Sequence, residues 1–331
     1  MGPTSAATRS ERLSSSISGG SVASALWSSP RQADRPGHLH LNRGRPVDGL
    51  PRPLEATLLR TRVLTSVVAI PVVLSAVYVG GWVLSTVVAA LALLAALELR
   101  RLALAAGAHW VCPVGVAAAP VAVILAMLGP VTPGLVIVVT TLVTLGWALA
   151  RQAPPRESAL GAASTIAISV YAGALPALFV LLRATPGTGA PSGGIDAGLA
   201  WTLYALAVTW VCDALAYFGG RAIGRRPFFA HVSPRKTAEG AAIGLAGAIG
   251  VGVLAAPYLG LSWPIGLTLG ALCGVAAEAG DLAESLLKRA AEVKDSGTLF
   301  PGHGGVLDRV DSLLFVAVVT WISAQVSGAV G

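Results

Sequence analysis

The chain has 331 residues, of which 54% are hydrophobic and only 12% are charged, and its mean hydropathy is +0.74. Because soluble domains usually carry about 25% charged residues, this composition excludes an ordinary soluble enzyme and indicates several membrane spans. The net charge of +7 is spread over the loops between apolar runs, and we expect no nucleic-acid partner. Three cysteines lie in apolar runs without a CxxC pair, which argues against both a disulfide framework and a zinc site.

Residues 1–57 differ in composition from the rest of the chain. They are rich in Ser, Gly, Pro and Arg, and up to Arg62 there are nine arginines against four acids. No apolar stretch of signal-peptide length occurs there. We expect a disordered basic tail, followed by a membrane-embedded domain over residues 58–331. The tail could attract anionic lipid headgroups, but a general preference for Arg explains its composition equally well.

Apolar runs long enough to cross a hydrocarbon core of about 30 Å follow one another through the remaining chain. They lack the alternation that is typical of a barrel strand, so we expect helices. The predicted fold is an all-α polytopic membrane protein, a bundle of about nine transmembrane helices. The predicted spans are 63–79, 81–97, 111–128, 134–149, 158–182, 197–218, 238–257, 263–284 and 311–329.

Basic residues fix the expected orientation of these spans. With nine spans, 22 of the 23 lysines and arginines fall on one side of the membrane, and Arg183 alone falls on the other. By the positive-inside rule the first side is cytoplasmic. We therefore expect a multi-pass protein of the plasma membrane with a cytoplasmic N-terminus and an outside C-terminus. Two polar loops, 219–237 and 285–310, would face the cytoplasm.

The loop 219–237 is a candidate phosphate site. Ser233 followed by Pro234 is typical of a helix N-cap with proline in the first turn. Cations and a hydroxyl around that helix N-terminus would suit a phosphate. The residues assigned to it are Arg221, Ser233, Arg235, Lys236 and Thr237. A positive-inside anchor with ordinary capping is the alternative, but it leaves Glu239 unexplained.

Lysine is used almost exclusively in the polar loops. The chain holds twenty arginines but only three lysines, Lys236, Lys288 and Lys294, and all three lie there. Lysine is a compact point charge that suits phosphate oxygens, whereas arginine is a planar fork. The distribution therefore favours phosphate binding at both loops, although three residues can also cluster by chance.

Acids at the ends of the last two spans predict a metal site. Four polar residues of the eighth span recur at spacings of three and four, which places them on one helix face. They are Glu278, Asp281, Ser285 and Lys288. Asp308 and Asp311 begin the ninth span. Carboxylates gathered in one pocket repel one another unless they bind a hard cation, and Mg²⁺ is the natural candidate.

A glycine-rich segment, PGHGGV over residues 301–306, lies between these acids. Its glycines allow successive backbone N–H groups to converge on an anion. His303 could donate to a phosphate oxygen or simply close the turn. Together with Gly304 and Gly305, it completes a second phosphate-binding candidate. The combined residues indicate nucleotidyl transfer to a lipid phosphate, which needs no general base.

The polar segments resemble those of the phosphatidate cytidylyltransferase family. The pattern S-x-x-K-R-x-x-x-x-K-D-x-G-x-x-x-P-G-H-G-G-x-x-D-R-x-D runs from Ser285 to Asp311. Two upstream elements, D-x-x-A-Y-x-x-G-R and S-P-x-K-T-x-E-G, begin at Asp213 and Ser233. Ala238 stands where the family often has an aromatic residue, a change that removes no polar group. The resemblance covers roughly residues 58–329.

This resemblance implies transfer of CMP from CTP to phosphatidate, giving CDP-diacylglycerol and pyrophosphate in phospholipid biosynthesis. It also implies Mg²⁺, with K⁺ as a second cation, and a homodimer among membrane lipids. The metal-linked acids it implies are Asp281, Asp308 and Asp311. The phosphate ligands it implies are Lys236, Lys288, Lys294 and Arg309. We add Arg289 as a phosphate ligand and Asp213, Glu239, Glu278 and Asp295 as supporting acids.

Two other functions compete with this interpretation. A CDP-alcohol phosphotransferase or a polyprenol kinase would also serve lipid phosphates, but neither the spaced acids of the former nor a P-loop is present. A transporter could use Asp213, Glu278 and Asp281 as an ion path. Transport predicts charges at the bilayer midplane and related halves, whereas these acids gather toward the cytoplasmic ends.

Overall fold

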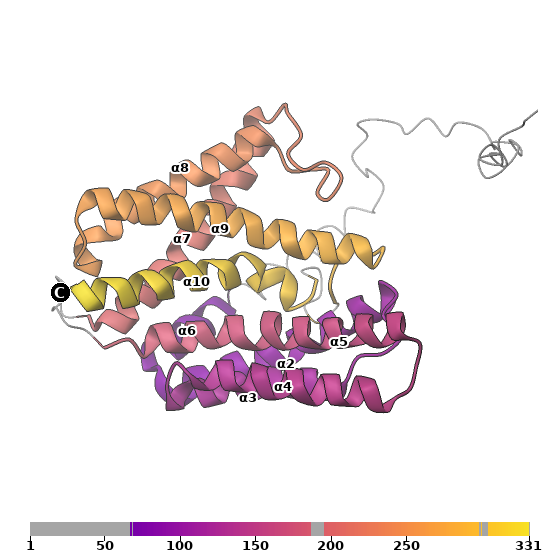
Figure 1. Cartoon of the computed structure of the whole chain (residues 1–331). Coiled ribbons are helices and arrows are strands. Elements are labelled where there is room, and N and C mark those ends of the chain that lie inside the picture. Colours follow the sequence, from indigo (N-terminus) through magenta and orange to yellow (C-terminus); the bar gives the residue numbers. More distant parts are fainter. Residues whose placement is uncertain (1–66, 68, 187–194, 298, 300–303, 331) are drawn as a thin grey trace, which may run out of the picture. The chain divides into compact units, whose positions relative to one another are not determined.

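The computed structural model describes residues 67, 69–186, 195–297, 299 and 304–330, and this part of the chain is built from helices (Figure 1). The helix Ala69–Val79 comes first. It is followed by α2 (Gly81–Ala105), α3 (Pro113–Leu125), η2 (Ala126–Leu128), α4 (Thr132–Ala150), α5 (Pro155–Ser169), the π-helical turn η3 (Val170–Ala174), α6 (Leu175–Arg183), α7 (Ala197–Ile223), α8 (Ala238–Ala255), η4 (Ala256–Leu259), α9 (Trp263–Ala290) and α10 (Leu307–Val330). Within the described residues, strand-type pairing is limited to an isolated bridge between Pro227 and Thr237.

The all-α polytopic fold class is confirmed. As far as the structure describes them, all nine predicted spans fall on helices. Seven helical stretches of the described chain are long and apolar enough to cross a membrane, and two more, Ala69–Val79 and Pro113–Leu128, are shorter. The fourth span is the complete helix α4, which is mostly exposed and so suited to face lipid. The predicted tail 1–57 and residues 63–66 lie outside the described residues.

Prolines and glycines set where several helices begin and end. Pro113, Pro155 and Pro264 stand in the first turns of α3, α5 and α9, where a missing backbone N–H costs no helical hydrogen bond. Gly80 has a φ of 67°, which side chains rarely allow, and it separates the helix Ala69–Val79 from α2. The loop positions therefore follow from residue types that interrupt a helix.

The last four helices pack against one another in chain order, α7 on α8, α8 on α9 and α9 on α10. Small residues make the α8–α9 contact possible. A Cβ added at Gly252 of α8 would collide with the backbone of Gly270 in α9, and one at Gly274 would meet the side chain of Leu245. Gly266, Gly270 and Gly274 of α9 thus let a neighbouring helix approach closely.

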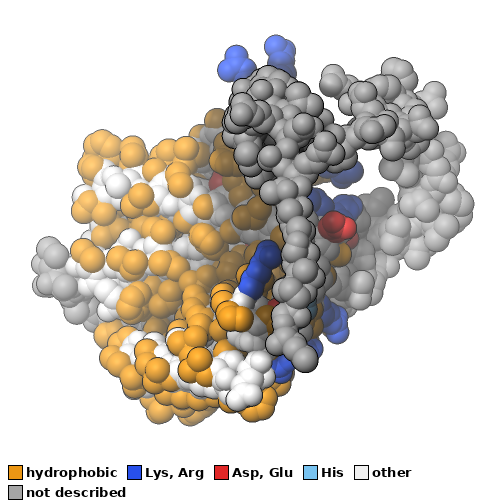
Figure 2. Space-filling model, turned by 45° about the vertical axis from the view of Figure 1, so that its right-hand side comes forward, with side chains coloured by type: hydrophobic (Ala, Val, Ile, Leu, Met, Phe, Trp, Pro, Cys, Tyr) orange, Lys and Arg blue, Asp and Glu red, His pale blue; other side chains and the backbone are white. Residues whose placement is uncertain are grey.

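Charged side chains gather at one end of this bundle. There α2, α7 and α9 end and α8 and α10 begin, and hydrogen bonds join these ends to one another. In Figure 2 the left of the molecule shows hydrophobic side chains mixed with uncharged groups and backbone, and the visible blue and red side chains lie toward the centre and right. The apolar flank suits lipid, and the charged end suits the membrane surface.

Candidate functional site

The loop between α7 and α8 is folded back on itself before α8 begins. The N–H of Phe228 donates to the carbonyl of Lys236 (2.9 Å), and the N–H of Ala238 donates to the carbonyl of Arg226 (2.9 Å). Because this pairing keeps Thr237 in an extended conformation, α8 starts at Ala238 with Thr237 as its N-cap. The predicted N-cap at Ser233 is therefore wrong.

The loop between α7 and α8 places Lys236 against the polar face of α9. Its Nζ lies 2.7 Å from Oε2 of Glu278 and 2.8 Å from Oδ2 of Asp281. Burial lowers the pKa of Lys236, but the carboxylates of Asp281 and Glu278 outweigh that effect and raise it above its ordinary value. Lys236 therefore remains an ammonium group at the edge of an acidic cluster. The predicted helix face of Glu278, Asp281, Ser285 and Lys288 is confirmed, since Ser285 Oγ donates to Asp281 Oδ1 (3.3 Å).

Lys288 forms a second and more enclosed ion-pair site. Its Nζ contacts Glu284 one turn earlier on α9 and lies 2.7 Å from Oδ1 of Asp308 on α10. The other Asp308 oxygen accepts the backbone N–H of Ser296 (2.9 Å), the Ser296 hydroxyl (2.9 Å) and the N–H of Gly305 (2.8 Å). Asp308 thus joins α9, α10 and the glycine-rich segment.

Glu284 is a member of this site that the sequence interpretation missed. Its residue surface is fully buried, and its Oε1 has no hydrogen-bond partner among the described residues. The available signal was its spacing, three residues after Asp281 and four before Lys288, which places it on the same helix face.

Two further acids complete the cluster from other helices. Asp213 of α7 accepts a hydrogen bond from the Ser312 hydroxyl (3.4 Å), and Asp311 accepts the Ser312 backbone N–H (2.8 Å). The carboxylate of Asp311 acts electrostatically on both Asp213 and Glu284. Bringing α9 and α10 together therefore gathers their acids, as expected.

Six carboxylates accordingly face two ammonium groups in this cluster. The acids are Asp213, Glu278, Asp281, Glu284, Asp308 and Asp311. Within the described residues, no three His, Cys, Asp or Glu side chains form a group ready to hold a metal ion. The donors nevertheless fit a hard divalent cation, because Mg²⁺ needs only one or two carboxylates beside water and phosphate oxygens. The buried Oε1 of Glu284, which has no hydrogen-bond partner among the described residues, is a further oxygen donor beside them.

Several other predicted residues order the two polar loops. Glu239 accepts the backbone N–H groups of Arg225 (3.0 Å) and Arg226 (3.1 Å) and so fixes the basic turn. Arg289 donates to the carbonyl of Val232 (3.2 Å) in one loop and to that of Val293 (2.9 Å) in the other. These contacts give both residues a place in the architecture, while their roles toward phosphate stay predictions.

The other predicted residues that the structure describes lie in turns or at exposed positions. Arg221 is on the exposed end of α7, with its Nη1 3.4 Å from the hydroxyl of Tyr217. Ser233 forms a turn whose carbonyl accepts the N–H of Lys236 (3.2 Å). Gly304 has a φ of 81° beside Asp308, and His303 lies outside the described residues. The exposed candidates are Arg235, Lys294, Asp295 and Arg309.

Two residues that precede α7 in the chain also belong to this part of the structure. Glu98, in the last turns of α2, is 5% exposed and accepts the backbone N–H groups of Val306 and Leu307 at the start of α10 (both 2.9 Å). Tyr171 lies in η3 and packs edge-on against Phe315 of α10 (6.2 Å between ring centroids). The signal for Glu98 was an isolated acid at the end of an apolar run.

The Tyr171 hydroxyl is buried and finds no hydrogen-bond partner among the described residues. The carboxylates of Asp311, Glu284 and Asp281 act on it electrostatically. Tyr171 is carried by a π-helical turn, a feature that often occurs at functional sites. A buried phenol beside several acids is therefore a further candidate for contact with a bound phosphate.

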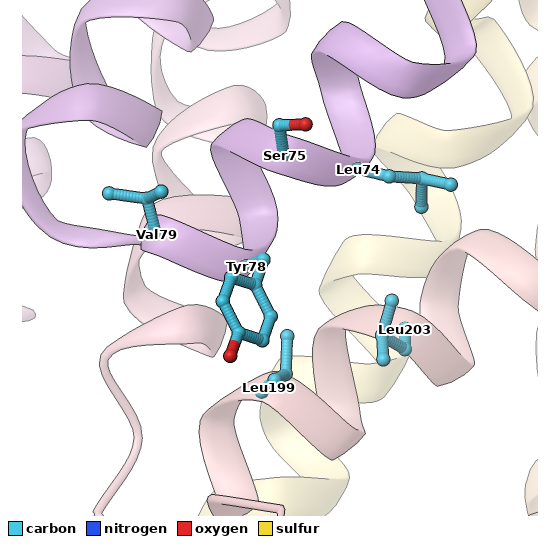
Figure 3. A pocket seen from close by; sticks show the side chains of 6 residues that line it. All are labelled: Leu74, Ser75, Tyr78, Val79, Leu199 and Leu203. Carbon is cyan, nitrogen blue, oxygen red and sulfur yellow. The ribbon is translucent and has the colours of Figure 1, made fainter.

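A groove of about 540 Å³ lies at the other end of α7, between its first turns and the helix Ala69–Val79 (Figure 3). The side chains that line it are Leu74, Ser75, Tyr78, Val79, Leu199 and Leu203. None of them carries a charge at neutral pH, so the lining offers neither a carboxylate for a metal nor a cation for a phosphate.

Comparisons with known proteins agree on one family. A model described as the cytidylyltransferase family matches residues 60–327. The chain is 34% identical over 282 residues to a phosphatidate cytidylyltransferase of Synechocystis, covering 78% of this chain and 94% of the relative. It is 35% identical over 279 residues to phosphatidate cytidylyltransferase 5, chloroplastic, of Arabidopsis thaliana, covering 76% and 68%. A phosphatidate cytidylyltransferase of Bacillus subtilis is 44% identical over 126 residues, covering 36% and 45%.

Proposed function

The chain belongs to the cytidylyltransferase family, and we propose that the helix ends around Lys236 and Lys288 form its active site. The protein is a multi-pass membrane nucleotidyltransferase that makes CDP-diacylglycerol from CTP and phosphatidate. The proposal concerns which residues carry the reaction, which cations assist it and which side of the membrane it faces.

The observation that carries this proposal is the placement of two ammonium groups between carboxylates on adjoining helix ends. Lys236 bridges Glu278 and Asp281, and Lys288 bridges α9 to Asp308 on α10. Ammonium groups bind phosphate oxygens, and acids beside them hold the cations that accompany a nucleotide triphosphate. A site at the membrane surface is open to a soluble nucleotide and to a lipid headgroup alike.

In the proposed reaction, an ionised phosphate oxygen of phosphatidate attacks the α-phosphorus of CTP in line. The bond from the α-phosphorus to the oxygen that bridges to the β-phosphate breaks, and pyrophosphate leaves with that oxygen and its electron pair. An ionised phosphate needs no general base, so the protein contributes orientation and charge neutralisation. Lys236, the more exposed lysine, turns from its carboxylates toward the incoming phosphates.

We also propose that Asp281, Asp308 and Asp311 hold Mg²⁺, with K⁺ as a second cation. The excess of carboxylates over ammonium groups and the unpaired Glu284 oxygen support a cation here. When bound, the metal would neutralise charge on the phosphates. Lys288 and Ser296 keep Asp308 in place for this role.

The orientation and assembly are further proposals. The excess of basic residues on one side supports a cytoplasmic N-terminus and active site and an outside C-terminus in the plasma membrane. Arg183, the single basic residue of the other side, ties α6 to Asp196 at the start of α7 (2.9 Å). We propose a homodimer on the family resemblance, and cross-linking in membranes at low protein density tests it.

The test of the activity uses the purified full chain in detergent micelles with phosphatidate, Mg²⁺ and labelled CTP. We expect label to enter the lipid fraction from CTP and not from ATP, GTP or UTP run in parallel. Asp281→Asn should abolish incorporation, whereas Glu292→Gln, an exposed acid beyond the end of α9, should leave it unchanged. A well-folded chain that incorporates no nucleotide would overturn the proposed activity.

A further inference from the structure

The buried carboxylate of Glu98 in α2 caps the N-terminus of α10. Oε1 of Glu98 accepts the N–H of Val306 and Oε2 accepts the N–H of Leu307, each at 2.9 Å. These are N–H groups at the helix start that have no partner within the helix. A negative charge at this end also interacts favourably with the helix dipole. Glu98 therefore fixes where α10 begins although it lies more than 200 residues earlier in the chain.

The same carboxylate reaches the enclosed ion-pair site through one serine. The Ser296 hydroxyl lies 2.9 Å from Oε2 of Glu98 and 2.9 Å from Oδ2 of Asp308. A hydroxyl carries a single proton, so the two carboxylates share this donor. No hydrogen bond or ion pair among the described residues joins Glu98 directly to Lys288 or to Asp308. The hydrogen-bond contact of Glu98 with the site therefore runs through Ser296 and the backbone that Glu98 holds.

The close position of Glu98, rather than turn geometry, explains two glycines of the motif that runs from Ser285 to Asp311. A Cβ on Gly297 would lie 2.5 Å from Oε1 of Glu98, and a Cβ on Gly305 would collide with both Glu98 oxygens. Neither glycine has a φ in the left-handed region, in contrast to Gly304. Their missing side chains make room for the carboxylate of α2.

We propose that Glu98 is a positioning residue for the reaction. It holds the Ser296 hydroxyl and the backbone N–H groups of Val306 and Leu307 so that Asp308 faces Lys288, and it thereby couples the first half of the bundle to the active site. The inference rests on the proposed function, because it concerns the same site. It adds a residue outside every polar motif of the sequence.

The experiment compares Glu98→Gln with Glu157→Gln, a partly exposed acid in the first turn of α5 that serves as the matched control. Glutamine keeps the size of the side chain, but its NH₂ group faces backbone donors. We expect kcat to fall about 10- to 100-fold, as for other groups that orient catalytic ligands, with KM for CTP changed less than about two-fold. The control should match the unmodified protein.

A double-mutant cycle separates positioning from general stabilisation. Ser296→Ala removes the shared hydroxyl and leaves both backbone contacts of Glu98, so it also serves if Glu98→Gln does not fold. If Glu98 acts through Ser296, the double variant should lose little more activity than Glu98→Gln alone. The proposal would be overturned if the double variant lost activity by the product of the two single-variant factors. It would also be overturned if both single variants kept a near-normal kcat.

Amide hydrogen exchange supplies a readout that does not depend on turnover. In Glu98→Gln, peptides covering residues 296–312 should exchange faster, while peptides from α7 and α8 should not change. If the unmodified protein proves inactive with CTP but this local loosening is seen, the proposed function fails and the positioning role stands. Unchanged exchange over 296–312 would contradict the positioning role itself.

Discussion

The two lysine sites differ in how completely they are enclosed. At the first, the side chain of Lys236 is 20% exposed and that of its partner Asp281 is 34% exposed. At the second, Lys288 is 11% exposed and its partner Glu284 only 1%. Lys236 arrives on a loop at the edge of the acidic cluster, whereas Lys288 is built into the contact between α9 and α10. In the proposed mechanism Lys236 is placed to meet substrate, whereas Lys288 also holds α9 and α10 together.

Replacing each lysine with methionine tests this difference most strongly. Lys288→Met would leave Glu284 and Asp308 buried without their cation, and breaking such a pair costs about 3–5 kcal/mol in soluble proteins. We therefore expect a clear loss of thermal stability in detergent together with lost activity. Lys236→Met should lose activity with little change in melting temperature. Equal melting temperatures for Lys288→Met and Lys236→Met would contradict the difference in structural role between the two lysines.

Asp281→Asn should be the largest purely chemical effect. The carboxylate is partly exposed and lies at the open site, so the amide should leave a folded, membrane-inserted protein. Turnover should fall at least about 100-fold, the range seen when one group that stabilises developing charge is removed. Initial rates with saturating CTP and a melting curve on the same preparation check both statements. Near-normal turnover would remove Asp281 from the proposed metal site.

Exchanging lysine for arginine sharpens the comparison further. Arginine keeps the charge but needs space for a planar fork. Lys288→Arg should be severely impaired because its surroundings are closed, whereas Lys236→Arg should retain more activity at its open edge. The measurement is the ratio of the two kcat/KM values. A ratio near one would show that charge alone suffices at both positions.

Tyr171→Phe should give the smallest effect, and one confined to activity. The hydroxyl has no partner among the described residues, so its removal should cost no stability. A fall in kcat/KM of about 10-fold, the size of one hydrogen bond to a charged group, would indicate contact with a bound phosphate. Tyr204→Phe, another buried hydroxyl in α7, is the matched control and should not change activity.

Most of the fold, and all members of the acidic cluster except Glu284, could be predicted from the sequence for identifiable reasons, while their roles in the reaction stay predictions. Helix positions follow from local composition, and the shared face of Asp281 and Lys288 follows from helical periodicity. The pairing of Lys236 with Glu278 joins residues 42 positions apart and depends on how α8 packs on α9, so spacing alone could not reveal it. The N-cap predicted at Ser233 was wrong because pairing of the neighbouring backbone segments moves the start of α8 to Ala238.

Glu98 and Tyr171 show the other limit of prediction from sequence. Neither belongs to a polar motif. Both lie far along the chain from the residues that they contact on α10, and only the tertiary structure brings them together. Glu284 is different, because its spacing of three residues from Asp281 and four from Lys288 already places it on their helix face.

The link from Glu98 to the start of α10 has a consequence for biosynthesis. The chain is made from its N-terminus, so α2 enters the membrane long before α10 exists. Until residues 296–307 emerge, the Glu98 carboxylate lacks the serine hydroxyl and both backbone donors that it has in the finished protein. The buried acid of α2 is therefore compensated only once the start of the final helix has been made, which places completion of the proposed active site at the end of synthesis.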